Sequence, residues 1–454
     1  MTTTNEYSVL TLCGGRPLRG AVRLAGFKHS LVLTVAYLLG RGGPARLVNV
    51  PDLFEVEVYE ELLPAIGVTG LRREQESLSW AGISHTGDVI RLPEIADRIH
   101  GSLYLLPALV ASGRPVVFDG FGGCRIGDGP NGQRPWRHVV DVMCRFGARF
   151  TETAGGAVVH APSGFTGADV DLLDYASDRG SAAGPEYSGA TKAAVLAAAL
   201  GDGRSVLRTP YLKSELRSLL DVVESTGVAV LRNADDVVIK VGAETATAAR
   251  AGTVRVPPDL LEAATWITSV GVAGGRLEIR GITADLLDRD LPHETAIWRA
   301  VGIEVAPNAT DDGVVVSAPA SGLLAPMPDI GVRPDGIYSD CHPLLAVLAT
   351  RCAGVTTITD QVWTNRYAYA EGLGRLGADV TVDERGVHIG PSIGLREPSG
   401  PLPATDLRCA AAYLLASLRV PAPTTVTGAQ HLRRGYGGLV EKLFGMGVKV
   451  DAGH

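Results

Sequence analysis

The same pattern of apolar and polar positions occurs six times along the chain. A helical apolar stretch is followed by a glycine and then by a segment in which apolar and polar residues alternate. The glycines are separated by 80, 80, 75, 75 and 70 residues and are Gly67, Gly147, Gly227, Gly302, Gly377 and Gly447. Glycine at the end of a helix accepts the left-handed conformation that turns the chain directly into a strand. The pattern therefore predicts six repeated α+β units.

Units of this size cannot bury their own apolar face, so we expect them to pack against one another. Six coincidental junctions of helix, glycine and strand are the alternative interpretation. Two successive prolines, Pro257 and Pro258, interrupt either a helix or a central strand. They indicate a boundary between two lobes of three units each. We predict a first lobe of residues 24–255 and a second lobe of residues 1–23 together with 256–454.

Composition narrows the class of protein. The 454 residues, 46% of them hydrophobic, are enough for two or three domains with filled cores, which excludes disorder and a collagen. The formal net charge of −7 argues against nucleic acid or an anionic membrane as partner. The six cysteines are scattered without a C-x-x-C pair, so neither a disulfide framework nor a structural metal is indicated. Without a signal sequence or a membrane-length apolar stretch, we expect a cytoplasmic protein.

Two loops in the first half carry candidate chemistry. Lys28 stands where the strand-like AVRLA meets an apolar helical run, a position at which a lysine can pair with an anion at the helix start. A surface lysine is the alternative. Cys124 lies in the glycine-rich stretch 120–135 beside Arg125, and a mobile thiol near positive charge is what a reactive cysteine needs. A small buried cysteine is the commoner fate of this residue type.

Four segments of the second half place Asp or Arg just before helical apolar runs. Several arginines at helix starts could converge on one multiply charged anion, with a carboxylate as base. Helix caps and surface ion pairs are the alternatives. The residues of these segments are Asp340, Trp363, Arg366, Asp406, Arg408 and Arg434.

Taken in order, the six-unit repeat, the FKH loop, the GGC-R-I-G…RP loop, D-L-R and R-G-Y resemble the enolpyruvyl transferase family, from about Leu10 to Val450. The resemblance implies an α/β fold: a two-lobed inside-out α/β barrel built from six repeated α+β units, as in EPSP synthase. It also implies transfer of the enolpyruvyl group of phosphoenolpyruvate to an acceptor hydroxyl with release of phosphate. The resemblance implies no metal and no organic cofactor, because phosphoenolpyruvate is a co-substrate whose energy lies in its trapped enol.

The resemblance also implies site residues. Asp340 matches the family's base toward the acceptor hydroxyl, and Cys124 matches a residue that acts as acid or captures the substrate covalently. Lys28 is the alternative proton carrier. The groups implied for phosphoenolpyruvate are Lys28, Arg134, Arg408 and Arg434. The groups implied for the acceptor are His29, His100, Trp136, Arg137, His138, Ser188, Gly189, Asp340, Trp363 and Arg366.

The chain departs from the family pattern where the acceptor should bind. His29 replaces an asparagine, His100 replaces an arginine, and nine residues separate Cys124 from Arg134 where the pattern has four. We therefore expect unchanged chemistry on a changed acceptor, the 3′-hydroxyl of UMP, as in the branch of the family found in nucleoside antibiotic pathways. The alternatives are UDP-N-acetylglucosamine in peptidoglycan synthesis, a shikimate phosphate, and a repeat scaffold without catalysis. The sequence leaves the oligomeric state open.

Overall fold

The computed structural model describes residues 7–127, 129, 132–153, 156–242, 252–364 and 366–453. The chain divides between Pro257 and Pro258 into two compact units. The Lys28 unit is Gly26–Pro257, and the Asp340 unit is Met1–Ala25 together with Pro258–His454. These bounds lie two residues beyond the predicted ones. The expectation of no signal sequence concerns residues 1–6, which lie outside the described residues.

Each unit contains three four-stranded sheets, and all six sheets share one topology. One edge strand runs parallel to its neighbour, and the other two pairings are antiparallel. In one sheet, for example, Val254 pairs with Leu47 in parallel and Leu47 pairs with Leu78 in antiparallel register. The sixfold recurrence confirms the predicted repeat.

The sheets of the Lys28 unit, in strand order, are β16 (Thr253–Arg255), β3 (Ala45–Val48), β6 (Ser77–Trp80) and β5 (Arg72–Glu74); β8 (Ile90–Arg91), β9 (Val116–Phe118), β11 (Gly156–His160) and β10 (Arg149–Thr153); and β12 (Asp169–Asp171), β13 (Gly203–Arg208), β15 (Asp236–Val241) and β14 (Ala229–Arg232). A short pair, β4 (Val68–Thr69) and β7 (Gly82–Ile83), completes this unit's strands in the described residues.

The sheets of the Asp340 unit are β2 (Leu18–Arg23), β17 (Gly275–Arg280), β19 (Gly313–Ala318) and β18 (Glu304–Pro307); β20 (Ile330–Val332), β21 (Thr356–Asp360), β23 (Gly386–Ile389) and β22 (Val380–Asp383); and β24 (Leu402–Pro403), β25 (Thr424–Thr427), β1 (Val9–Cys13) and β26 (Lys449–Gly453).

The six junction glycines adopt the backbone conformation that the pattern predicts. Their φ angles are +101°, +95°, +88°, +90°, +84° and +80° in chain order, a region that favours glycine. Each follows one helix and precedes an antiparallel strand. The helices are α2 (Phe54–Ala65), α4 (Arg137–Arg145), α6 (Ser214–Ser225), α9 (Pro292–Ala300), α11 (Tyr369–Arg375) and α13 (Leu439–Gly445).

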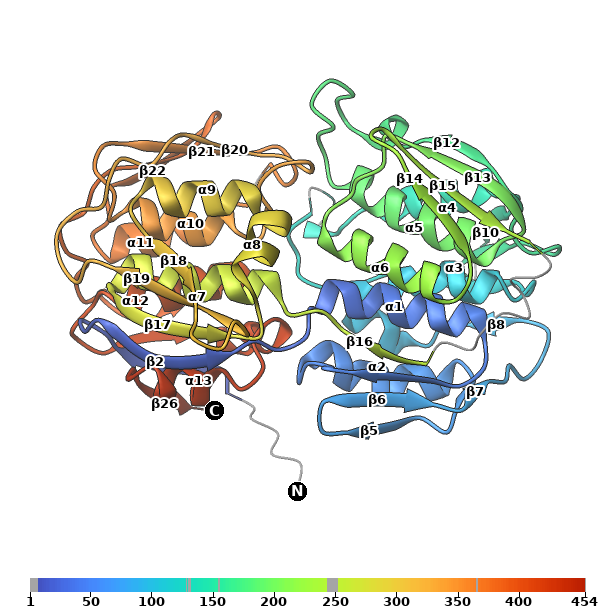
Figure 1. The fold of residues 1–454 in the computed structure, drawn as a ribbon, viewed down its shortest axis with the longest axis horizontal. Coiled ribbons are helices and arrows are strands. Elements are labelled where there is room, and N and C mark those ends of the chain that lie inside the picture. Colours follow the sequence, from blue (N-terminus) through green and yellow to red (C-terminus); the bar gives the residue numbers. More distant parts are fainter. Residues whose placement is uncertain are drawn as a thin grey trace. The chain divides into compact units, whose positions relative to one another are not determined.

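A second set of helices forms the core of each unit. In the Lys28 unit, α1 (Lys28–Arg41), α3 (Leu105–Val110) and α5 (Glu186–Leu200) contact one another, and α6 lies beside α1 (Figure 1). In the Asp340 unit, α7 (Leu260–Ala273), α10 (His342–Ala349) and α12 (Leu407–Ser417) do the same. These helices are apolar on nearly all sides, which is typical of helices enclosed by others. Lys28, His342 and Arg408, which are discussed below, lie in the first turns of α1, α10 and α12.

The remaining helical segments are α8 (Ala284–Asp290) and the 3₁₀ turns η1 (Glu94–Arg98), η2 (His100–Tyr104), η4 (Leu172–Tyr175) and η5 (Ala429–Arg434). In the described part of the chain, no helix has the length and apolar character needed to cross a membrane.

Candidate active site

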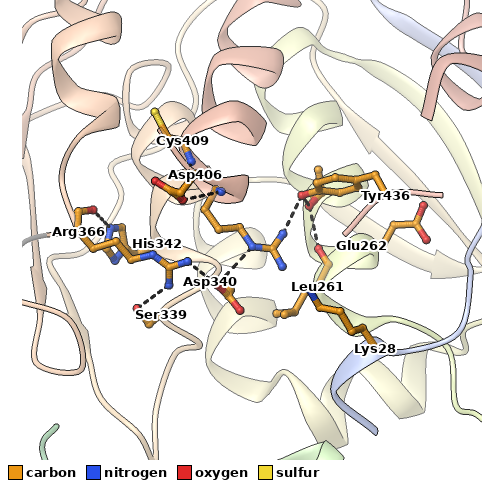
Figure 2. Close-up of polar contacts among 12 residues, drawn as sticks. Lys28, Leu261, Glu262, Ser339, Asp340, His342, Arg366, Asp406, Cys409 and Tyr436 are labelled. Carbon is orange, nitrogen blue, oxygen red and sulfur yellow. Dashed lines mark hydrogen bonds and ion pairs between the residues drawn. The ribbon is translucent and has the colours of Figure 1, made fainter. Parts of the chain in front are cut away.

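In the Asp340 unit, three predicted site residues are in direct contact. Asp340 lies just before α10, and its Oδ1 accepts a hydrogen bond of 2.6 Å from Nη2 of Arg366. Nε of Arg408 lies 3.4 Å from the same oxygen. Arg366 and Arg408 are buried, whereas the Asp340 side chain is 21% exposed. Figure 2 shows Arg366 and Tyr436 on opposite sides of Asp340. One carboxylate is thus enclosed by two fixed cations.

The start of α12 sets the position of Arg408. Asp406 caps this helix, since its Oδ1 accepts hydrogen bonds from the backbone N–H groups of Arg408 (2.9 Å) and Cys409 (3.3 Å). The Arg408 guanidinium donates to the Tyr436 hydroxyl at 2.8 Å. Burial alone would lower the pKa of Arg408, but Tyr436, Asp340 and Asp259 raise it above the ordinary arginine value. Arg408 therefore stays charged, ready to bind a phosphate or carboxylate.

Two further predicted site residues, Trp363 and Arg434, belong to this unit. Trp363 donates its backbone N–H to Oδ1 of Asp360 at 3.1 Å. Arg434 is the last residue of η5. Burial is the largest cause that lowers the pKa of His431, and the charge of Arg434 lowers it further. An acidic group near His431, Asp406, acts in the opposite direction. Arg434 thus adds positive charge close to the cap of α12.

In the Lys28 unit, Lys28 opens α1 and pairs with a carboxylate. Its Nζ lies 3.2 Å from Oε1 of Glu55, and the two side chains are 16% and 10% exposed. The ring of the next residue, His29, packs 5.1 Å from the ring of Phe27. The predicted phosphate-binding lysine is therefore held at the start of a core helix by Glu55.

The loop of Cys124 packs on residues 97–100, which end at His100. A Cβ at Gly122 would lie 1.5 Å from the Asp97 carbonyl oxygen, and one at Gly123 would lie 2.8 Å from Cβ of His100. Gly123 also has a φ of +107°. The Cys124 carbonyl accepts a 3.2 Å hydrogen bond from Nε of Arg134. The glycines thus allow a close approach that brings Cys124, Arg134 and His100 together.

Two histidines in this region have buried ring nitrogens that lack a partner. Burial lowers the pKa of His100 and, together with the charge of Lys192, lowers that of His138 to about 4. Nδ1 of each ring is buried and has no hydrogen-bond partner among the described residues. His138 packs against α5, where a Cβ at Gly189 would lie 2.1 Å from its Nε2. Buried nitrogens without partners are costly, so these two are expected to bind an ordered water or a ligand group.

Lys192 and Glu215 form a buried ion pair that the sequence analysis missed. Nζ of Lys192 lies 3.3 Å from Oε1 of Glu215, which also accepts a 3.0 Å hydrogen bond from the Tyr211 hydroxyl. The ammonium lies 5.8 Å from the ring centre of Tyr104 and 5.4 Å from that of Tyr211. Burial raises the pKa of Glu215, but the charges of Lys192 and His29 outweigh it and lower that pKa to about 2. We call Lys192, Glu215, Tyr104 and Tyr211 the Lys192 group.

A signal for Lys192 was present in the sequence. It is one of only six lysines, and it stands directly after the sequence Gly-Ala-Thr in an otherwise uncharged run, 187–200. A single charge in a core helix is either paired or functional. The partner, Glu215, has no such signal.

Three other residues predicted for the acceptor make contacts of a different kind. The Trp136 ring packs on Phe118 and Phe150, with ring centres 5.3 and 6.2 Å away. Arg137 is exposed and pairs with Glu152 of β10. Ser188 donates to the Pro185 carbonyl at 3.2 Å. The described polar and ring contacts of these three side chains do not include the Lys192 group, Cys124 or His100.

The described residues contain no cluster of three or more His, Cys, Asp or Glu side chains suited to a metal ion. The polar groups described above are instead cations, two neutral imidazoles and a thiol in the Lys28 unit, and a carboxylate between arginines in the Asp340 unit. Such groups can bind an anion and exchange protons with it.

Comparison with known proteins places this chain among carboxyvinyl transferases. The sequence profile of the family named EPSP synthase (3-phosphoshikimate 1-carboxyvinyltransferase) matches residues 12–443. A UDP-N-acetylglucosamine 1-carboxyvinyltransferase of Anaeromyxobacter dehalogenans is 30% identical over 444 residues, which cover 96% of this chain and 97% of that protein. The enzyme of the same name from Afipia carboxidovorans is 26% identical, with 97% and 98% covered.

Solved structures agree with these likenesses. The enolpyruvyl transferase NikO of Streptomyces tendae superposes with a TM-score of 0.87 at 34% identity, over 98% of each chain. An EPSP synthase of Acinetobacter baumannii gives a TM-score of 0.70 at 15% identity, over 98% of this chain and 99% of that one, and this likeness concerns the fold alone. The predicted fold class is confirmed.

Proposed function

We propose, from the premise that this chain belongs to the EPSP synthase family and is an enolpyruvyl transferase, that its acceptor is the 3′-hydroxyl of UMP. In the reaction, a proton adds to C3 of phosphoenolpyruvate and C2 becomes electrophilic. The acceptor hydroxyl loses its proton, and its oxygen attacks C2. Phosphate and a C3 proton then leave the tetrahedral adduct, and the product is an enol ether.

In the Asp340 unit, we assign the proton transfer at the acceptor hydroxyl to Asp340. Its carboxylate is the partly exposed acceptor in the cluster, and Arg366 and Arg408 hold it in one orientation. Arg408 and Arg434 are assigned to the charged groups of phosphoenolpyruvate, because a guanidinium binds phosphate and carboxylate through two parallel hydrogen bonds.

In the Lys28 unit, Lys28 and Arg134 are assigned to the same substrate. Cys124 is assigned either to the protonation of C3 or to covalent capture of the substrate, and Lys28 is the alternative proton donor. No metal or organic cofactor is proposed, since the energy of phosphoenolpyruvate lies in its trapped enol and phosphate is the leaving group.

The Lys192 group and the two unpartnered imidazole nitrogens support a phosphorylated acceptor. A largely buried ammonium, and two buried imidazole nitrogens that donate a hydrogen bond when they carry the ring's proton, suit the oxygens of a phosphate group. The tyrosine rings beside Lys192 exclude water and strengthen such contacts. The ammonium of Lys192 together with the two unpartnered imidazole nitrogens is the observation that carries the proposal.

UMP is favoured over the alternatives because the departures from the family pattern fall on acceptor positions. His29, His100 and the longer loop after Cys124 differ, while Lys28, Arg134, Asp340 and Arg408 match. A change confined to acceptor positions is expected when the acceptor, and not the chemistry, has changed. UDP-N-acetylglucosamine, which appears in the enzyme names of the similar proteins above, is the second candidate acceptor.

The test is phosphate release from phosphoenolpyruvate by the purified full-length chain, with UMP, UDP-N-acetylglucosamine or shikimate 3-phosphate offered in parallel. We expect release only with UMP, a product heavier than UMP by one enolpyruvyl group, and an unchanged rate in EDTA. Turnover with UDP-N-acetylglucosamine alone would replace UMP by the second candidate. A product with shikimate 3-phosphate, or none with any acceptor, would refute the uridine nucleotide.

Lys192→Met should raise the KM for UMP by about 10- to 100-fold, because a charge-assisted hydrogen bond contributes about 1.5–3 kcal/mol. The KM for phosphoenolpyruvate should change less than threefold. Steady-state kinetics with each substrate varied in turn measure both values. An unchanged KM for UMP would remove Lys192 from the acceptor site.

Lys192→Met also leaves Glu215 buried without its cation, which threatens the fold. The double variant Lys192→Met/Glu215→Gln removes both charges and should restore the melting temperature while keeping the high KM for UMP. Lys240→Met is the matched control, since Lys240 is exposed on β15. Its kinetic constants should equal those of the parent protein.

A further inference from the structure

The first residue of α10, His342, is fully buried between two hydrogen-bond acceptors. Its Nδ1 lies 2.9 Å from Oδ2 of Asp360, and both side chains have 0% exposure. Its Nε2 lies 3.1 Å from the backbone carbonyl oxygen of Arg366. A carbonyl oxygen only accepts, so Nε2 must carry a proton. The remaining question is whether the proton between Nδ1 and Oδ2 belongs to the histidine or to the aspartate.

The other contacts of Asp360 place that proton on His342. Oδ1 of Asp360 accepts backbone N–H groups of Val362 at 2.8 Å and Trp363 at 3.1 Å. Oδ2 also accepts the hydroxyl of Ser339. A carboxylate surrounded by three donors besides the imidazole is stabilised in its ionised form. Burial raises the pKa of Asp360, but the contacts of His342, Ser339 and Arg366 lower it overall.

The His342–Asp360 pair supports Arg366 at two points, through His342 and through Ser339, and Figure 2 shows these two residues beside Arg366. The ring binds the backbone carbonyl of Arg366, and Asp360 holds the Ser339 hydroxyl that accepts a 3.1 Å hydrogen bond from Nη1 of Arg366. The second terminal nitrogen of Arg366 then reaches Asp340 at 2.6 Å. A neutral His342 beside an ionised Asp360 would lose one of its two hydrogen bonds, and Arg366 would lose part of its support.

We propose that His342 is a positioning residue, a buried imidazolium that orients the Asp340 carboxylate through Asp360, Ser339 and Arg366. The proposal deepens the proposed function and rests on it, because it gives Asp340 the role of base. His342 does not touch the reacting atoms. It acts by restricting the orientations of Arg366, and small misplacements of catalytic groups cost large factors in rate.

A second histidine–aspartate pair in the same unit gives a matched control. Nε2 of His388 lies 3.0 Å from Oδ1 of Asp383, and its Nδ1 lies 3.1 Å from the Thr357 hydroxyl. A hydroxyl can donate as well as accept, so this ring needs only one proton. Neither ring nitrogen of His388 bonds to Arg366 or to its partners.

The first arm of the test is ¹⁵N NMR of the whole protein labelled at histidine, recorded at pH 7.5 without substrates. We expect both ring nitrogens of His342 to show the shifts of protonated nitrogens, with the signal assigned by its loss in His342→Gln. A bare nitrogen in this ring would overturn the proposal. This arm needs no turnover, so its outcome is independent of whether UMP is the acceptor.

The second arm is kinetic. His342→Gln should lower kcat by about 10- to 100-fold with the KM for phosphoenolpyruvate changed less than threefold, whereas His388→Gln should leave both within twofold. Ser339→Ala removes the hydroxyl that links Arg366 to Asp360 and leaves the buried His342 in place. This variant should also lower kcat, and it keeps the test valid if His342→Gln does not fold. The two substitutions together should cost less than the product of their separate effects, because both act through Arg366. An unchanged kcat in folded His342→Gln or in Ser339→Ala, or effects that multiply, would contradict the proposal.

Discussion

Replacing Asp340 by asparagine should lower kcat by on the order of 10³-fold, because the amide cannot take a proton from the acceptor hydroxyl. The amide oxygen can still accept a hydrogen bond from Arg366, so the geometry of the site should be retained. The KM for phosphoenolpyruvate should stay the same or fall, since the variant removes a negative charge beside two arginines assigned to that substrate. Initial rates of phosphate release at saturating substrates measure the effect.

The matched control for Asp340 is Asp335→Asn. Asp335 is exposed, precedes Asp340 by five residues, and pairs only loosely with Arg333 at 3.5 Å. The kcat of Asp335→Asn should equal that of the parent protein. An Asp340→Asn variant that keeps a tenth or more of the parent kcat would show that another group accepts the proton.

Replacing Arg408 by methionine should lower the free energy of unfolding by about 3 kcal/mol and remove most of the activity. Truncating one partner of a buried ion pair costs about 3–5 kcal/mol, and the lower end applies because Asp340 keeps Arg366. The Tyr436 hydroxyl loses its donor as well, although it keeps Thr265 at 2.8 Å. We expect kcat/KM for phosphoenolpyruvate to fall by at least 100-fold, since a charge-assisted contact to the substrate is lost. Urea unfolding and initial rates check the two effects.

A surface arginine separates the role of Arg408 from a general loss of charge. Arg299 pairs with Asp288 at 2.9 Å, and both side chains are about half exposed. Arg299→Met should change the free energy of unfolding by less than about 0.5 kcal/mol and leave the kinetics alone. If Arg408→Met unfolds at the same urea concentration as Arg299→Met, the buried cluster does not stabilise the fold.

The repeat and its junctions could be predicted because their causes are local. Gly67, Gly227 and their equivalents end helices with a positive φ angle. Backbone sterics and the neighbouring residues alone account for a glycine at such a position. The start of α12 is local in the same sense. Asp406 caps this helix by accepting a hydrogen bond from the backbone N–H of Arg408, two residues later in the chain. A predicted helix start therefore predicts which side chains stand there.

The contacts among these side chains are not local. Arg366 is 26 residues from Asp340, and Lys192 is 23 residues from Glu215. No periodicity connects such positions, because the sheets between them set the distance. The contacts of Trp136 and Arg137 are also with distant residues, Phe118, Phe150 and Glu152, and the acceptor role that the resemblance implies for these two side chains stays a prediction.

The sequence by itself determined the sixfold repeat, the family and the residue types at each helix start, because these depend on the order of neighbouring residues. Only the tertiary structure decided which of those residues meet. It paired Lys192 with Glu215 and seated His342 between Asp360 and the Arg366 carbonyl. The physical reason is that the charge state and orientation of a buried group depend on the atoms packed around it, and distant segments supply those atoms.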